Sequence, residues 1–377
     1  MANERTALVL GGGGARAAYQ VGVLLAIRDV LGPHQPNPFP IVCGASAGAV
    51  NAATLACYSA NFSVAVDALA DVWRNMHADH IYRADALGIG STALKWLGAL
   101  LLGWALKRSP RSLLDNQPLR RLLEQRLDFT RIARSIERGT LYAASITASG
   151  YVSGHSVSFF QAHPDVQTWR RAQRAGCRTE LTVDHLLASS AIPFIFPAVH
   201  LNREYFGDGS MRQLAPISPA IHLGARKVLI IGVAQAVDSL PRQSSRRYPT
   251  PAQIIGHVLS SIFLDGLAVD AERIERVNRT LALIPNERDS ESTLGLRPLR
   301  SLIISPSERL DYLAARNAHT LPWPVRTLLH SLGAMNRRGG ALTSYLLFEK
   351  AYTEALIALG YKDAMERADD LRAFFAE

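Results

Sequence analysis

Cysteine is scarce in this chain of 377 residues, which contains only Cys43, Cys57 and Cys177. The three are odd in number, widely spaced and set in apolar surroundings, so the sequence predicts neither a disulfide framework nor a Cys-x-x-Cys metal site. We therefore expect no metal, no other cofactor and a reducing compartment. A secretion signal is also missing, because the apolar run at residues 7–10 is short and no cleavage site follows it. These absences favour a cytoplasmic protein.

Acidic residues are fewer than basic ones, with 32 Asp and Glu against 41 Lys and Arg, and the net charge is +9. Such a chain suits an anionic partner, and the two obvious candidates are nucleic acid and an acidic lipid surface. The arginines are scattered, however, and no basic motif interleaved with aromatic residues is present. The sequence therefore argues against nucleic acid and keeps a lipid surface as the partner to consider.

One short stretch organises the rest of the chain. An apolar run at residues 40–43 leads into Gly44-Ala45-Ser46-Ala47-Gly48, and an alanine-rich helical pattern follows. This order is typical of a nucleophile elbow, a sharp turn between strand and helix that exposes a serine hydroxyl. Small residues flank such a turn because larger side chains would collide with the strand and the helix. Ser46 is therefore a candidate nucleophile, and the alternative is a turn that only allows close packing.

A second glycine-rich turn precedes the elbow. Residues 6–10 read as a buried strand, and Gly11-Gly12-Gly13-Gly14-Ala15-Arg16 connect it to a helical pattern over residues 17–31. Backbone amides in such a loop favour an anion, which can be a dinucleotide, a nucleotide phosphate or the oxyanion of an acyl transfer. A P-loop would end in Gly-Lys-Ser/Thr, and a dinucleotide fold would carry an acidic residue near Cys43. The sequence therefore favours the oxyanion.

The two turns follow consecutive strands, and such turns lie side by side at one edge of a parallel sheet. We therefore expect the glycine loop and Ser46 to share one crevice. Only one strand precedes the serine, which argues against the common α/β-hydrolase order. A catalytic histidine that follows a later acid stays an alternative, since His222, His257, His319 and His330 lie far enough along the chain, but none of them sits in a distinctive loop signature.

Asp208 is a candidate base for the serine. It lies in Gly207-Asp208-Gly209, directly after the apolar pair Tyr205-Phe206, which reads as a strand that ends in a tight turn. An aspartate in such a turn usually caps its own backbone. A serine nucleophile needs a base within hydrogen-bond reach, however, and burial can raise the pKa of a carboxylate toward a useful value.

These residues together resemble the patatin-like phospholipase family. The likeness covers roughly residues 6–234 and is carried by Gly-Gly-Gly-Ala-Arg, the early Gly-Ala-Ser-Ala-Gly and the later Asp-Gly pair, with a further mark in Ala188-Ser189-Ser190-Ala191-Ile192-Pro193. It implies an α/β fold, a three-layer α/β/α sandwich with a mainly parallel central sheet, and a serine–aspartate dyad without histidine. The chain departs from the family at Ala17 and Ser210, where glycine is common.

Carried over residue by residue, the resemblance makes Ser46 the nucleophile and Asp208 its partner. It makes the oxyanion loop from four residues, which are Gly12, Gly13, Gly14 and Arg16. The side chain of Arg16 is expected either to orient the loop by bonding to backbone carbonyls or to meet a substrate phosphate.

Residues 86–106 form the longest apolar segment and include Trp96 and Trp104. Glycines and the central Lys95 argue against a membrane span. Basic residues follow at Lys107, Arg108 and Arg111, which favours a hairpin or helix that lies in the interface of an anionic membrane. A buried cap or a lid over the active site is the alternative.

A polar, proline-bearing stretch at residues 238–251 marks a predicted boundary. It separates a catalytic domain over residues 1–237 from a mainly helical C-terminal extension over residues 238–377, which packs on it. Within the extension we expect edge strands at residues 281–285 and 302–306 and an amphipathic helix at residues 346–359.

The sequence therefore predicts a phospholipase A or carboxylester hydrolase that acts on phospholipid or other acyl-ester lipids through a serine acyl-enzyme. Peripheral membrane contact is part of this prediction, and the oligomeric state is left open. Two alternatives come from other classes of protein: a nucleotide-binding protein that uses the glycine loop, and a non-catalytic membrane-bound scaffold.

Overall fold

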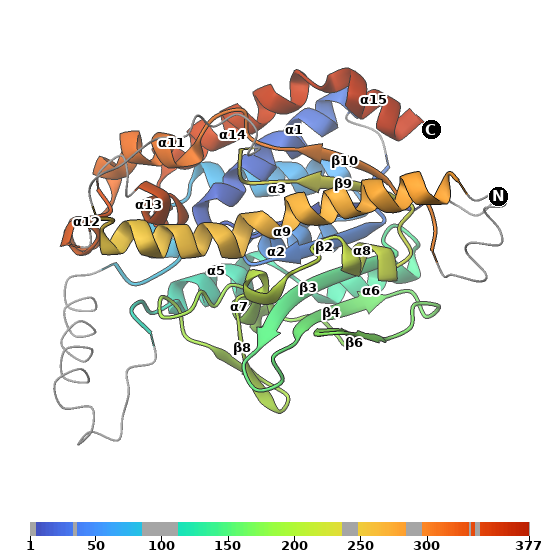
Figure 1. Ribbon diagram of the computed structural model, residues 1–377, viewed down its shortest axis with the longest axis horizontal. Helices are drawn as coiled ribbons and strands as arrows, with labels where there is room; N and C mark the ends of the chain where they lie inside the picture. Colours follow the sequence, from blue (N-terminus) through green and yellow to red (C-terminus); the bar gives the residue numbers. More distant parts are fainter. Residues whose placement is uncertain are drawn as a thin grey trace.

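The protein is known from a computed structural model, which describes residues 5–32, 36–84, 112–235, 248–283, 296–331, 333–335 and 340–376. Figure 1 shows a central sheet with helices on both of its faces. This is the three-layer α/β/α arrangement that the sequence predicted. The apolar segment at residues 86–106 and most of the predicted boundary at 238–251 lie outside the described residues.

The described strands form one ten-stranded sheet whose centre is parallel. Five neighbouring strands run in the same direction in the order β10 (Arg300–Ile304), β9 (Lys227–Ile231), β1 (Thr6–Leu10), β2 (Ile41–Ala45) and β3 (Ala143–Gly150). The register pairs Leu10 with Gly44 and with Ile231. The carboxyl ends of β1, β2 and β9 therefore meet at one edge of the sheet.

The remaining strands extend the sheet beyond β3, and one of them brings the polypeptide back to the carboxyl end of β3. β4 is antiparallel to β3, whereas β8 pairs with only the last two residues of β3 and places the turn after it at the same edge. These strands are β4 (Ser156–Ala162), β5 (Trp169–Arg171), β6 (Arg174–Arg178), β7 (Val199–Leu201) and β8 (Glu204–Gly207).

Alternating side chains of the strands bury two separate cores, because successive residues of a strand point to opposite faces. On β1, Leu8 and Leu10 belong to one core, whereas Ala7 and Val9 belong to the other. The larger core lies against α1 (Ala18–Leu31), α2 (Ala47–Cys57), α3 (Phe62–Arg74) and α14 (Lys350–Met365). The smaller core lies against α8 (Ser218–His222) and part of α9 (Pro251–Leu281).

The other described helices connect these layers. Short 3₁₀ turns are η1 (Gly14–Ala17), η2 (Ala78–His80), η3 (Gly209–Arg212) and η5 (Ala318–Thr320). The α-helices are α5 (Gln117–Arg126), α6 (Thr130–Glu137), α7 (Val183–Ser189), α11 (Leu310–Asn317), α12 (Trp323–Ser331), α13 (Gly340–Leu346) and α15 (Ala368–Ala376). No helix within the described ranges is long and apolar enough to cross a bilayer.

The C-terminal region is mainly helical and packs closely on the N-terminal one. α14 lies along α1 in Figure 1, and a side chain on Gly22 would overlap the carbonyl of Ile357. A side chain on Gly360 would likewise overlap the carbonyl of Tyr19. Each helix thus has a glycine at the contact with the other, which allows their backbones to approach closely.

Two details of the C-terminal predictions differ from the structure. Residue 281 does not open an edge strand, because α9 begins at a capping box between Thr250 and Gln253 and continues to Leu281. The helix expected at 346–359 is divided between α13, which ends at Leu346, and α14, which begins at Lys350. The edge strand predicted at 302–306 is present as β10. The division of the chain at residues 237 and 238 stays a prediction.

Candidate active site

Ser46 occupies a sharp turn between β2 and α2. Its backbone has φ 53° and ψ −131°, in a region that residues with side chains rarely adopt. The flanking glycines allow this turn. A Cβ on Gly44 would lie 2.5 Å from the Cα of Ala49, and a Cβ on Gly48 would overlap the carbonyl oxygen of Leu10. The sequence therefore folds locally as the predicted nucleophile elbow.

The hydroxyl of Ser46 donates a hydrogen bond to Oδ2 of Asp208 over 2.6 Å. The two residues are 162 positions apart in the sequence, and β8 carries Asp208 to the edge where β2 ends. Ser46 is 2% exposed and Asp208 is 0% exposed. The other carboxylate oxygen of Asp208 accepts from the amide of Ser210 at 2.9 Å, which fixes the carboxylate plane. A hydroxyl and a carboxylate are thus paired away from bulk water.

Burial controls the ionisation of this pair. It raises the pKa of Asp208 to about 7, because a charged carboxylate is poorly solvated there. Hydrogen bonds from Ser46 and from the backbone at Ser210 favour the charged form and oppose this rise. A carboxylate with a pKa near neutrality is well matched to accept and return a proton.

A further serine, which the sequence analysis did not single out, holds the elbow in place. The backbone amide of Ser46 donates to Oγ of Ser189 at 2.8 Å, and that hydroxyl donates to the carbonyl of Thr147 at 2.6 Å. The next segment also holds Asp208, whose amide donates to the carbonyl of Ala191 at 3.0 Å. Both contacts come from residues 188–193, so the family-like block in the sequence was the signal for them.

The glycine loop lies against Ser46. A Cβ on Gly12 would be only 2.8 Å from the Cβ of Ser46, and Gly14 lines the same cavity as Ser46, so the two turns are adjacent as expected. Gly13 accepts from the amide of Arg16 at 3.1 Å, which closes η1. In the described part of the chain, the amides of Gly12, Gly13 and Gly14 donate to no other backbone group.

The side chain of Arg16 points toward the C-terminal region. Its Nε donates to Oγ of Ser344 at 2.8 Å, and its guanidinium lies 4.2 Å from the ring centroid of Tyr345. The residue is 5% exposed. A side chain on Gly14 would overlap the carbonyl of Tyr345. Arg16 and Gly14 therefore dock the loop on α13, and the side-chain bond goes to a hydroxyl rather than to the loop carbonyls considered from the sequence.

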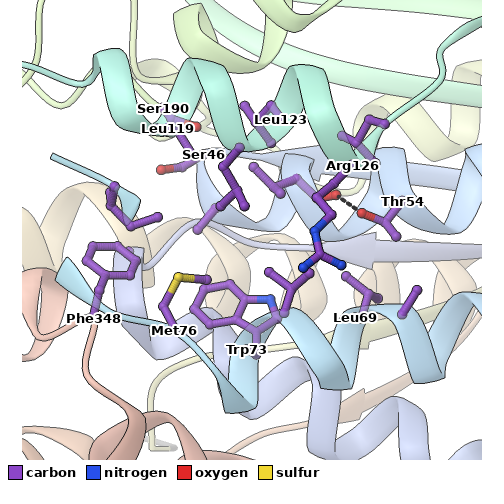
Figure 2. A pocket seen from close by; sticks show the side chains of 18 of the residues that line it. Ser46, Thr54, Leu69, Trp73, Met76, Leu119, Leu123, Arg126, Ser190 and Phe348 are labelled. Carbon is purple, nitrogen blue, oxygen red and sulfur yellow. Dashed lines mark hydrogen bonds between the residues drawn. The ribbon is translucent and has the colours of Figure 1, made fainter. Parts of the chain in front are cut away.

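A mostly apolar cavity of about 110 Å³ extends from Ser46. Helices α2, α3 and α5 supply most of its walls, and Phe196 and Phe348 contribute from two loops. Figure 2 shows Ser46 and Ser190 near one end, whereas Thr54 and Arg126 lie toward the other. The lining also includes Val50, Leu69, Val72, Trp73, Met76, Ile81, Leu119, Leu122 and Leu123. Its shape and chemistry suit a hydrocarbon chain.

Two of the histidines considered from the sequence make contacts with other residues. His222 stacks on Trp169 with a centroid distance of 4.8 Å, and a ring nitrogen of His319 lies 3.1 Å from the carbonyl of Arg316. Among the residues described, no group of three or more His, Cys, Asp or Glu side chains is placed to hold a metal ion. The three cysteines are free.

Much of the chain is similar to a known protein family. A family model described as Patatin-like phospholipase matches residues 8–221, a range that contains the glycine loop, Ser46 and Asp208. The chain matches no curated protein. Among solved structures it is similar to the crystal structure of VipD from Legionella pneumophila, with 12% identity and a TM-score of 0.37. That alignment covers 97% of this chain and 67% of the other.

Proposed function

This chain belongs to the patatin-like phospholipase family, whose members are lipid acyl hydrolases, and we propose that it hydrolyses acyl-ester lipids with Ser46 as nucleophile and Asp208 as base. One observation carries this proposal. The serine hydroxyl, held on a strained turn, donates to a buried carboxylate at 2.6 Å. Such a pair is what nucleophilic catalysis by serine requires.

The reaction follows from the positions of these groups. Oγ of Ser46 attacks the ester carbonyl while its proton passes to Asp208, and the tetrahedral oxyanion forms beside the amides of Gly12, Gly13 and Gly14. Asp208 then gives the proton to the leaving alcohol as the carbon–oxygen bond breaks. Water then attacks the acyl carbon while its proton passes to Asp208. As the bond from that carbon to Oγ of Ser46 breaks, Asp208 returns the proton to Oγ, which releases the fatty acid and restores the serine hydroxyl.

The apolar cavity supplies the acyl site in this proposal. A chain esterified to Ser46 would run along α2 toward Thr54, which lies eight positions further along the helix. At the rise of an α-helix this distance is about 12 Å. Burial of a hydrocarbon chain there is favourable in proportion to the apolar area removed from water.

The substrate class proposed is phospholipid or another acyl-ester lipid, with peripheral contact to the cytoplasmic face of a membrane. The apolar cavity that begins at the nucleophile supports a lipid acyl chain over a nucleotide. A bound nucleotide would leave this apolar cavity empty. A nucleotide-binding P-loop would also end in a lysine, whereas here Gly12 of the glycine loop packs against Ser46. A non-catalytic scaffold would not need the buried serine–aspartate pair.

Labelling with a fluorophosphonate tests the proposal. The purified protein should gain one adduct by intact mass, peptide mapping should place the adduct on Ser46, and Ser46→Ala should gain none. Wild-type protein should also hydrolyse p-nitrophenyl butyrate. A folded protein that is neither labelled nor active would favour the scaffold, and strong thermal protection by a nucleotide without ester hydrolysis would favour the nucleotide-binding alternative.

A further inference from the structure

A continuous chain of side-chain hydrogen bonds crosses three helices and ends on the glycine loop. Nε1 of Trp73 on α3 donates to Oδ1 of Asn51 on α2 at 2.8 Å. Nδ2 of Asn51 donates to Oε1 of Gln20 on α1 at 2.9 Å. Nε2 of Gln20 then donates to the carbonyl of Gly11 at 2.8 Å. The chain therefore connects α3 to the residue that precedes Gly12.

All three side chains are removed from water. Gln20 and Asn51 are 0% exposed, and Trp73 is 3% exposed. Asn51 uses its second amide hydrogen as well, donating to the carbonyl of Ala17 at 3.2 Å. A buried amide that loses its hydrogen-bond partner is destabilising, so each link of the chain constrains the next.

The donor and acceptor roles along this chain of hydrogen bonds run in a single direction, which the groups at its two ends determine. An indole N–H is only a donor, so the oxygen of Asn51 must face Trp73. The nitrogen of Asn51 therefore faces the oxygen of Gln20, and the nitrogen of Gln20 faces Gly11, whose carbonyl is only an acceptor. Neither amide can flip without breaking bonds at both of its sides.

The two ends of the chain belong to different parts of the candidate site. Trp73 lines the apolar cavity, where Figure 2 shows it beside Met76, and it stacks on Phe348 with a centroid distance of 6.3 Å. Gly11 precedes Gly12, which packs on Ser46. The chain thus joins a wall of the proposed acyl site to the proposed oxyanion loop.

We propose that Gln20 and Asn51 are positioning residues for the oxyanion loop, and that Trp73 makes their action depend on the acyl chain in the cavity. Oxyanion donors act only when they are held close to the position that the developing charge will occupy. An acyl chain packed on the indole holds the Trp73 ring in the orientation that donates to Asn51. This proposal rests on the proposed function and assigns the residues no contact with the reacting atoms.

Trp73→Phe is the first test, because it keeps an aromatic ring and removes only the indole donor and some bulk. We expect kcat for p-nitrophenyl decanoate to fall about three- to tenfold, as for loss of one buried hydrogen bond, with a much smaller change in KM. The kcat for p-nitrophenyl butyrate should fall by a smaller factor, since a short chain packs less on this wall while the loop still loses part of its support. Trp169→Phe, the same change away from the site, should alter neither rate.

Gln20→Met tests the link next to the loop. It should lower kcat for both esters about tenfold and slow fluorophosphonate labelling, with KM little changed, because the loop loses its support whatever the acyl chain. All rates are divided by the concentration of labelled sites. If both variants had lower thermal stability but an unchanged kcat, the hydrogen bonds would have only a structural role, and the proposal would be overturned. Failure of the wild-type protein to hydrolyse either ester would instead refute the proposed function.

Discussion

Gly12 packs directly against Ser46, because a Cβ atom on Gly12 would lie 2.8 Å from the Cβ of the serine and 2.9 Å from Cδ1 of Phe263. It would also overlap the hydroxyl of Ser210. Its neighbour Gly11 is different, since a Cβ there would meet no atom within 4 Å. Two adjacent glycines of one loop therefore offer a matched pair for mutagenesis.

Gly12→Ala should lower kcat for p-nitrophenyl butyrate by about a hundredfold, in the range found for loss of an oxyanion donor, with a smaller change in KM. The added methyl group must displace either the loop or Ser46. Gly11→Ala should keep turnover within about threefold, since it adds the same group in open space. Steady-state kinetics on both variants measures this, and equal losses would show that the loop responds to flexibility rather than to contact with Ser46.

The raised pKa of Asp208 predicts the pH dependence of hydrolysis. Only the ionised carboxylate can accept the proton of Ser46, so kcat/KM should rise with pH and level off above the pKa of about 7. The logarithm of kcat/KM should fall by about one unit per pH unit below that value. A pH–rate profile with a soluble ester checks this, and a profile that is flat between pH 5 and 8, a window of about three units around that pKa, would exclude Asp208 as the base.

The same pKa predicts how Asp208→Asn changes stability. The folded protein holds a proton on Asp208 up to about pH 7, whereas the unfolded chain loses it near the ordinary value of 3.8. Stability is therefore lost as the pH rises from about 4 to about 7, by up to about 4 kcal/mol. The asparagine side chain does not ionise, so the variant does not lose this stability. Its free energy of unfolding in urea should exceed that of the wild type by almost nothing at pH 4 and by the largest amount above pH 7. An advantage that does not change with pH would contradict the shift.

The lining of the apolar cavity predicts selectivity for acyl chain length. Ala68 lines this cavity on α3, so Ala68→Phe should lower kcat/KM for p-nitrophenyl decanoate by about tenfold or more and leave the butyrate ester nearly unchanged. Val64 lies on the same helix but is exposed, and Val64→Phe provides the control. A ratio of decanoate to butyrate activity that is the same in both variants would place the acyl chain elsewhere.

Local signals in the sequence were sufficient to predict the two turns of the candidate active site. The glycines around Ser46 are required by contacts with nearby backbone, and the apolar runs of β1 and β2 follow from burial on both faces. The family resemblance pointed to Asp208. The expected strand at residues 281–285 was wrong at Leu281, because the pattern of an apolar run does not say where a long helix ends.

Tertiary structure alone decided which distant residues meet. The sequence does not indicate that Arg16 docks on Ser344, or that Gln20, Asn51 and Trp73 form one chain of hydrogen bonds. Glycine geometry and hydrophobic periodicity act over a few residues, so they are visible in the sequence. Buried polar partners depend on which faces of which helices are packed together, and only the folded chain brings those faces into contact.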